Sequence, residues 1–232
     1  MSELFPEYHK INGVYKRHRE GPDKGRFIIG EFAAPEFEYL FDSDWNWTEK
    51  IDGTNCRIAA YVDEDGQVDT RVGGRTDNAQ LHVDLVKVLD DIALKLEDWA
   101  HDQWHAEVEA KQTTQPYTVA LYGEGYGAGI QKGGAYRPDK SFILFDVKIG
   151  SSWLSYDNMF SIGTELGIDT VPLFGTFSLR EAIEDVQPGS RYGSRIAIDP
   201  SAFEGLVGVP SVPLFDKRHN RIIVKVKRKD FE

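Results

Sequence analysis

The chain has 232 residues, of which 41% are hydrophobic and 12% aromatic, a composition typical of an ordered globular protein. The net charge of -11 argues against a protein that coats nucleic acid by bulk electrostatics, but it leaves room for a local basic groove. The single cysteine, Cys56, excludes an internal disulfide framework, and no apolar run approaches the roughly 20 residues that span a bilayer. Because residues 1–7 lack the features of a signal peptide, we expect a cytoplasmic protein without a membrane partner.

The first half of the chain reads as strands and tight turns. Residues 26–30 are strand-like and follow a basic cluster at 16–19, which we interpret as a solvated charge run. A strand leads from Trp45 into Lys50, a second covers 57–62, and the Asp-Gly turn at 63–66 returns the chain as a hairpin over 67–72.

The stretch TEKIDGTNCR, residues 48–57, carries the strongest chemical signal. A lysine such as Lys50 is a covalent nucleophile when its amine is deprotonated, which burial or nearby positive charge brings about. Gly53 would let the backbone approach a ligand, while Asn55 and Arg57 alternate along a strand and offer donors to hydroxyl or phosphate groups. Taken alone, the Lys-x-Asp-Gly pattern is weak evidence and fits a surface turn with a solvated lysine better.

The clearest predicted helix follows a Gly-rich loop at 73–77. Its apolar residues recur at spacings of three and four, which marks one buried face that includes Leu85, Leu89 and Leu96. The helix either continues or restarts through Trp104 and Val108. His101 and His105 are four residues apart, but without a third ligand we do not expect zinc.

Two buried strands are predicted next, at 117–122 and 141–149. The Gly-rich loop expected at 123–129 fits neither the Walker spacing nor Gly-x-Gly-x-x-Gly. We therefore interpret Glu124, at the end of the first strand, as a residue that could hold a ribose hydroxyl or a metal.

The last third contains a short helix at 155–167, a strand at 169–177, and a capping box that begins with Ser178. Glu204 opens an apolar run at 203–209, and residues 221–227 alternate so that Lys225 and Lys227 share one face, which suits an anion. The basic residues crowded at 217–229 form either a basic patch or a strand edge guarded by lysines. Together these elements predict a single α+β domain over 1–232, built on antiparallel sheets.

The ordered set of motifs resembles the RNA ligase 2 family of covalent nucleotidyltransferases across nearly the whole chain. The resemblance implies a ligase adenylation fold, with antiparallel sheets flanked by helices, in which Lys50 attacks the α-phosphate of ATP. It implies that the backbone at Glu49 and Ile51 recognises adenine, that Asn55 lies near phosphate or ribose, and that Arg75 is the arginine of the motif after the first hairpin.

The later motifs complete this set of expected roles. Glu124 matches the acid that binds ribose, Phe145 the aromatic that stacks on adenine, and Glu204 the acid linked to metal and catalysis. Lys225 and Lys227 match the paired lysines that contact the α-phosphate. The expected cofactors are ATP and Mg²⁺ or Mn²⁺. The Gly-Glu-Gly of the third motif departs from the family, which usually has an apolar residue after the glutamate.

The resemblance implies three steps: formation of lysyl-AMP, transfer of AMP to a 5′-phosphate RNA end, and sealing to a 3′-hydroxyl. The RNA would be a nicked duplex or a single strand, and we expect a monomer. The chain ends just after the last motif, so we expect a minimal adenylyltransferase domain with no separate C-terminal domain, from a phage or bacterial RNA repair enzyme.

Three alternatives stay open at this point. An ATP-dependent DNA ligase uses the same chemistry, and a capping-type guanylyltransferase forms its lysyl-nucleotide from GTP. A non-catalytic RNA-end binding module would keep the fold without the covalent step, but it would leave the presence of Lys50, Glu204, Lys225 and Lys227 together unexplained.

Overall fold

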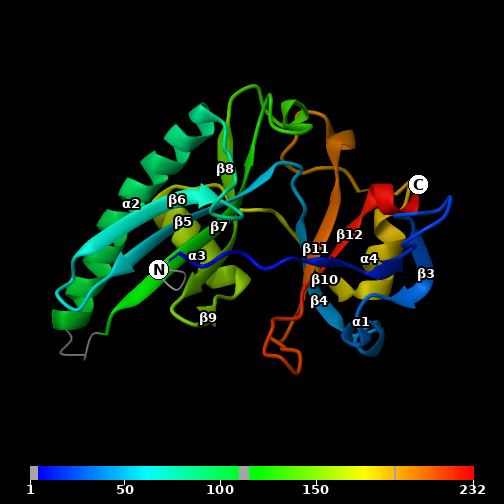
Figure 1. The fold of residues 1–232 in the computed structure, drawn as a ribbon, viewed down its shortest axis with the longest axis horizontal. Coiled ribbons are helices and arrows are strands. Elements are labelled where there is room, and N and C mark those ends of the chain that lie inside the picture. Colours follow the sequence, from blue (N-terminus) through cyan, green and yellow to red (C-terminus); the bar gives the residue numbers. More distant parts are fainter. Residues whose placement is uncertain (1–4, 110–114, 191) are drawn as a thin grey trace. The chain divides into compact units, whose positions relative to one another are not determined.

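The structure, a computed structural model, describes residues 5–109, 115–190 and 192–232. Residues 1–4, which contributed to the expectation about a signal peptide, lie outside the described residues. The chain forms two compact units: unit 1 comprises Met1–His9 and Asp52–Thr170, and unit 2 comprises Lys10–Ile51 and Val171–Glu232 (Figure 1). That both units act as a single catalytic domain stays a prediction.

Unit 1 is a five-stranded antiparallel sheet with helices on one face. The strand order is β6 (Val68–Gly74), β5 (Thr54–Val62), β7 (Tyr117–Tyr126), β8 (Ser141–Ile149) and β9 (Ser152–Trp153). Helices α2 (Val83–Glu109) and α3 (Tyr156–Leu166) pack on the sheet, and a short 3-10 turn covers Gly133–Ala135 (Figure 1).

The core of unit 1 follows from two periodicities in the sequence. On α2, Leu85, Leu89 and Leu96 are fully buried, and the helix continues to Glu109, so the predicted continuation is confirmed. On β5, Cys56 and the alternating residues after it face the helices, which places Asn55 and Arg57 on the opposite face of the sheet.

The boundary of β7 differs from the prediction. The strand runs to Tyr126, so Glu124 lies inside the sheet and not in a loop. Its neighbour Gly123 has no side chain, and there the ring of Phe142 would lie 2.2 Å from an added Cβ. A Gly-Glu-Gly sequence is a poor strand signal, because glycine has low strand propensity; the pairing with β5 and β8 outweighs it.

Unit 2 is a second five-stranded sheet with an added two-stranded ribbon. The sheet order is β1 (Asn12–Gly13), β12 (Val224–Lys227), β11 (Gly205–Pro210), β4 (Asp44–Glu49) and β10 (Leu173–Ser178). All these pairs are antiparallel except β1 with β12. The ribbon is β2 (Tyr15–Arg17) with β3 (Phe27–Phe32). Helices α1 (Pro35–Tyr39) and α4 (Leu179–Val186) and 3-10 turns at Pro200–Ala202 and Arg228–Phe231 complete the unit.

The core of unit 2 is built around two fully buried tryptophans, Trp45 and Trp47 of β4. The predicted capping box is confirmed, since Ser178 and Glu181 bond reciprocally at the start of α4. The predicted strand over 221–227 is shorter than expected, because its pairing with β1 and β11 begins only at Val224. The antiparallel α+β fold expected from the sequence is confirmed.

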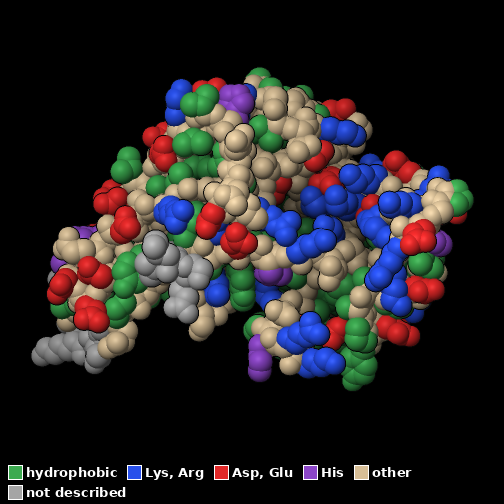
Figure 2. Space-filling model, in the orientation of Figure 1, with side chains coloured by type: hydrophobic (Ala, Val, Ile, Leu, Met, Phe, Trp, Pro, Cys, Tyr) green, Lys and Arg blue, Asp and Glu red, His purple; other side chains and the backbone are tan. Residues whose placement is uncertain are grey.

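Charge is divided unevenly between the two units. Unit 1 contains 10 Lys and Arg against 22 Asp and Glu, whereas unit 2 contains 17 against 16. The acidic character of the chain therefore belongs to unit 1, and Figure 2 shows Asp and Glu along α2 and Lys and Arg gathered over the part of unit 2 that carries β11 and β12. Among the described residues, no helix is long and apolar enough to cross a membrane.

Candidate active site

The backbone of unit 2 places Lys50 beside Glu204. Lys50 directly follows β4, and its N–H donates to the carbonyl of Gly205 at 2.9 Å, extending the β4–β11 pairing by one residue. Glu204 directly precedes β11 on the same pair of strands. Two residues separated by 154 positions in the sequence are thus brought together by a strand pairing that their flanking apolar residues favour.

Glu204 forms ion pairs with two lysines. Its Oε2 lies 2.5 Å from Lys50 Nζ, and its Oε1 lies 2.8 Å from Lys227 Nζ. Burial raises the pKa of Glu204, but the charges of Lys50 and Lys227 and the hydrogen bonds they donate outweigh burial, so the net shift is downward. The group is therefore a carboxylate at neutral pH.

Lys225 adds a third amine. Val224 and Val226 point into the core, and so Lys225 and Lys227 share the opposite face of β12, as predicted. Burial, followed by the charges of Lys227 and Lys50, lowers the pKa of Lys225 to about 8. Three amines facing one carboxylate leave an excess of positive charge at this face, which favours a bound anion such as a phosphate.

Gly205 is required by the same arrangement. Its φ of +149° lies in a region that L side chains rarely adopt, and an added Cβ would lie 2.1 Å from the carbonyl oxygen of Val226. Close pairing of β11 with β12 next to Glu204 therefore depends on the absence of a side chain here.

The side chains of Glu49 and Ile51 are buried within unit 2. Glu49 is 2% exposed; the Ser194 hydroxyl donates to its Oε1 at 2.5 Å and the Arg195 N–H donates to its Oε2 at 2.9 Å. Burial raises the pKa of Glu49, and these two bonds only partly offset it. Ile51 is also buried, so neither side chain is free to contact adenine, and the Glu49 N–H already donates to the Pro172 carbonyl at 3.0 Å. Sequence reasoning missed Ser194, for which the sequence holds no signal.

In unit 1, Asn55 and Glu124 are directly opposed on β5 and β7, on the face away from the helices. The Oδ1 atom of Asn55 is buried and accepts no hydrogen bond from any described residue. A buried acceptor of this kind costs free energy until a donor reaches it, and a ribose hydroxyl or a base amino group would serve.

Gly53 lies against the same strand. An added Cβ would lie 2.3 Å from the carbonyl oxygen of Gly125 and 2.8 Å from Cγ of Glu124. We expected this glycine to let the backbone approach a ligand. In the structure, a glycine is needed here because the turn packs directly on β7 and leaves no room for a side chain.

Phe145 lies at a β-bulge. Tyr122 pairs with Asp146 and Gly123 with Leu144, which leaves Phe145 as the extra residue of β8 and redirects its side chain. Its half-buried ring meets the ring of Tyr8 edge-on, with centroids 5.1 Å apart, and the Tyr8 hydroxyl donates to Asp146 Oδ2 at 2.8 Å. Sequence reasoning missed Tyr8, because its partners follow more than 100 residues later.

Arg57 has an internal role and does not offer its donors to a ligand, which corrects our expectation. The side chain is 1% exposed and donates to the carbonyls of Phe5 and Gly74 and to the carboxylate of Asp77, with the Phe5 ring stacked on the guanidinium. Arg75, in contrast, is exposed in the loop after β6 and forms no ion pair with any described residue.

The arrangement fits a divalent ion that arrives with a nucleotide. Among residues 5–109, 115–190 and 192–232, no three of His, Cys, Asp and Glu form a metal-binding cluster. The Nε2 atoms of His101 and His105 lie 3.1 Å apart without a third ligand from the described chain. Mg²⁺ is commonly held by one or two carboxylates together with substrate phosphates, so Glu204 is a sufficient protein ligand of that type.

A model of the RNA ligase family matches residues 43–227, which include every site residue predicted from the sequence. The chain belongs to the RNA ligase family. No curated protein matches the sequence significantly.

Solved structures of a Naegleria gruberi RNA ligase share the fold. A lysine-to-alanine variant with ATP and Mn matches with a TM-score of 0.55 at 16% identity, over 98% of this chain and 62% of that one. The enzyme with PPi matches with a TM-score of 0.52 at 17% identity, over 100% and 61%. A lysine-to-methionine variant with AMP and Mn matches with a TM-score of 0.54 at 16% identity, over 85% and 53%. The chain therefore spans about three fifths of the length of those ligases.

Proposed function

We propose that this protein is an ATP-dependent RNA ligase that acts through a lysyl-AMP intermediate on Lys50. The observation that carries the proposal is the Glu204 carboxylate bound to both Lys50 and Lys227, with Lys225 beside them. A solvated surface lysine would not be held at 2.5 Å from a buried carboxylate within a cluster of other amines. Membership of the RNA ligase family, and the ATP, AMP and Mn bound to its structural relatives, support the choice of nucleotide.

In the first step, Lys50 Nζ attacks the α-phosphorus of ATP. An N–P bond forms, the bond from the α-phosphorus to the bridging oxygen breaks, and pyrophosphate leaves with the electron pair. Because the attacking amine must be neutral, Lys50 first has to lose its proton and leave its ion pair with Glu204. The Lys50–Glu204 ion pair therefore belongs to a resting state, and binding of ATP has to break it.

The other residues of unit 2 then stabilise charge. Lys225 and Lys227 would face the α-phosphate oxygens as these accumulate negative charge, and a preorganised amine in a partly buried site stabilises such charge strongly. Glu204, once released from Lys50, would hold Mg²⁺ or Mn²⁺. When bound, the metal would supply further positive charge to the phosphates.

Residues of unit 1 would recognise the nucleoside. Phe145 would stack on adenine, Glu124 would accept a hydrogen bond from a ribose hydroxyl, and Asn55 Oδ1 would receive the donor that it lacks. Arg75 is exposed and would contact phosphate. These assignments assume that the two units work as one adenylyltransferase domain.

Two further steps complete ligation. A 5′-phosphate oxygen of RNA attacks the α-phosphorus, the P–N bond to Lys50 breaks, and Lys50 regains a proton. The 3′-hydroxyl of a second end then attacks the activated 5′-phosphorus, and AMP leaves. The substrates are RNA ends with 5′-phosphate and 3′-hydroxyl groups, in a nicked duplex or a single strand, and the enzyme acts as a monomer.

Incubation with α-labelled ATP and Mg²⁺ tests the proposal. We expect label to remain on the denatured protein, to disappear in Lys50→Ala, and to persist in Lys87→Ala, a matched change of an exposed lysine on α2. Labelling by GTP in place of ATP would indicate capping chemistry, whereas RNA binding without any label would indicate a binding module. Sealing of nicked DNA in preference to RNA would indicate a DNA ligase.

A further inference from the structure

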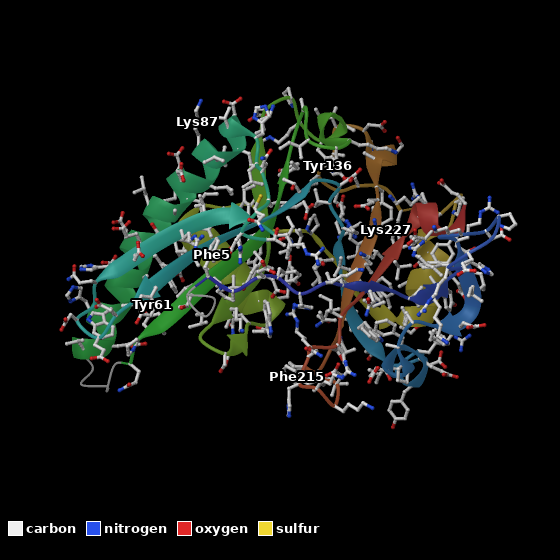
Figure 3. All side chains as sticks on the ribbon, in the orientation of Figure 1. Phe5, Tyr61, Lys87, Tyr136, Phe215 and Lys227 are labelled. Carbon is white, nitrogen blue, oxygen red and sulfur yellow. The ribbon has the colours of Figure 1, made fainter. Side chains whose placement is uncertain are left out.

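The loop between β11 and β12 presents an exposed aromatic side chain beside a group of cations. Residues 211–221 leave the sheet after Pro210 and return before Val224 (Figure 1). Phe215 is 53% exposed on this loop (Figure 3), and Val212 is 66% exposed. Lys217 and Arg218 are exposed next to Phe215 in the sequence, and Arg221 is half-buried.

The loop is ordered by its own hydrogen bonds. Asp216 Oδ1 accepts from the N–H groups of Arg218 and Asn220, each at 2.8 Å, and Asp216 Oδ2 accepts from the side chain of Asn220 at 3.0 Å. Phe215 and Arg221 form an antiparallel bridge at the neck, and His219 has the left-handed φ of +60° that closes the tip. A hairpin held in this way presents Phe215 with little loss of entropy on binding.

Lys217 and Arg218 differ from several other cations of unit 2, because no described carboxylate forms an ion pair with them. On the β2–β3 ribbon and the loop within it, three cations pair with acids: Lys16 with Glu31, Arg17 with Asp230, and Arg26 with Asp23. Arg19 and Lys24 of the same loop form no ion pair with any described residue. Neither Lys217 nor Arg218 forms an ion pair with any described residue, and the one acid of the hairpin, Asp216, is occupied by its three hydrogen bonds. The hairpin therefore offers positive charge to an anionic partner.

We propose that this hairpin is an RNA-docking element, in which Phe215 stacks on a base and Lys217 and Arg218 contact backbone phosphates. Aromatic side chains interleaved with cations are the combination by which proteins bind single-stranded nucleic acid, because every base offers a face for stacking. An apolar protein surface would cover the exposed apolar area but would leave the cations unpaired. The inference rests on the proposed function, since it names where the RNA of that reaction is held.

Three variants of the full chain separate stacking from charge. Phe215→Ala removes the ring, the double change Lys217→Ala with Arg218→Ala removes the charges, and Tyr39→Ala removes a similarly exposed aromatic, 88% exposed, at the end of α1. Each is titrated with a 5′-phosphorylated single-stranded RNA and with an abasic oligonucleotide of the same length. Labelling by α-labelled ATP, which involves no RNA, is measured on the same samples.

We expect Phe215→Ala to weaken RNA binding at least about fivefold and to leave binding of the abasic oligonucleotide unchanged. The double variant should weaken binding of both, with the slope of log K against log salt reduced by about 1.4, or roughly 0.7 for each lost phosphate contact. Tyr39→Ala should bind like the parent protein.

RNA binding by Phe215→Ala within twofold of Tyr39→Ala would overturn the inference. So would sedimentation of the parent protein as a dimer that Phe215→Ala converts to a monomer with unchanged RNA affinity, because the hairpin would then be a contact between copies. A parent protein that binds RNA through the hairpin but takes no label from ATP would refute the proposed function alone.

Discussion

The Lys50 ammonium lies 2.5 Å from the Glu204 carboxylate, within a group of side chains that are at most one fifth exposed. This pair couples the stability of unit 2 to the chemistry that we propose. It holds Lys50 in place before ATP arrives, and it has to be broken for the amine to react.

Replacement of Glu204 by Gln should destabilise the protein. The change leaves the amines of Lys50 and Lys227 without a counter-ion, at a cost of about 1–3 kcal/mol once partial exposure is taken into account. The free energy of unfolding by urea measures this cost, with Glu184→Gln on α4 as the exposed control. Equal stability of the two variants at neutral pH would contradict the prediction.

The same variant predicts a pH dependence. The folded pKa of Glu204 is lowered, so its contribution to stability is fully present above the unfolded value of about 4.5 and is lost as pH falls through the folded pKa. The difference in unfolding free energy between the parent protein and Glu204→Gln should therefore be constant from about pH 6 to 7 and shrink below about pH 4.5. A difference that grows in acid would refute this account.

Replacement of Lys225 by Met should stabilise the protein while abolishing labelling by ATP. The pKa of Lys225, lowered to about 8, shows that its charge is unfavourable in the folded state at neutral pH. Removal of that charge should raise the melting temperature by about 2–4 °C for roughly 1 kcal/mol. Because the penalty disappears as Lys225 loses its proton, the gain should diminish above about pH 8. Lys229→Met, at an exposed position, should show neither effect.

Replacement of Tyr8 by Ala should weaken nucleotide binding through Phe145. Loss of the edge-on contact frees the Phe145 ring, and such contacts contribute about 0.5–1.5 kcal/mol, which predicts a KM for ATP raised about three- to tenfold with kcat little changed. Tyr8→Phe keeps the ring contact and loses the hydrogen bond from the hydroxyl to Asp146, so its KM should stay close to that of the parent protein. An equal rise in both variants would assign the effect to the hydroxyl.

Cys56 should be unreactive in the folded protein. The thiol is fully buried, and burial, with a smaller contribution from the charge of Glu124, raises its pKa to about 12. Its reaction with a thiol reagent at pH 8 should therefore proceed only as fast as the protein opens, and urea should accelerate it sharply. Rapid labelling under native conditions would place Cys56 in an accessible site.

Local patterns in the sequence predicted much of the architecture. The helix period around Leu85 and Leu89, the alternation of β12 from Val224 to Lys227, and the capping box at Ser178 each depend on residues close in sequence, and the structure contains all three. The division into two units was not predicted, because both sheets are antiparallel and no linker marks the crossings near His9, Ile51 and Thr170.

The roles of individual polar residues were harder to predict, since they depend on partners that are distant in sequence. Arg57 looked available to a ligand because its position on β5 alternates with Asn55, yet Phe5 and Asp77 occupy its donors. Glu49 lies at a motif position, but its carboxylate accepts a hydrogen bond from the Ser194 hydroxyl within unit 2. Lys50 and Glu204 were both singled out, whereas their ion pair could be seen only after β4 had been paired with β11.

The most direct test of the account is to identify the residue that carries AMP. The protein is incubated with ATP and Mg²⁺, digested under conditions that preserve phosphoramidates, and analysed by mass spectrometry. The account predicts adenylyl on the peptide that contains Lys50, and none on that peptide in Lys50→Arg, which retains the positive charge beside Glu204. Adenylyl on a peptide containing Lys225 or Lys227, or its persistence in Lys50→Arg, would contradict the assignment of Lys50 as the nucleophile.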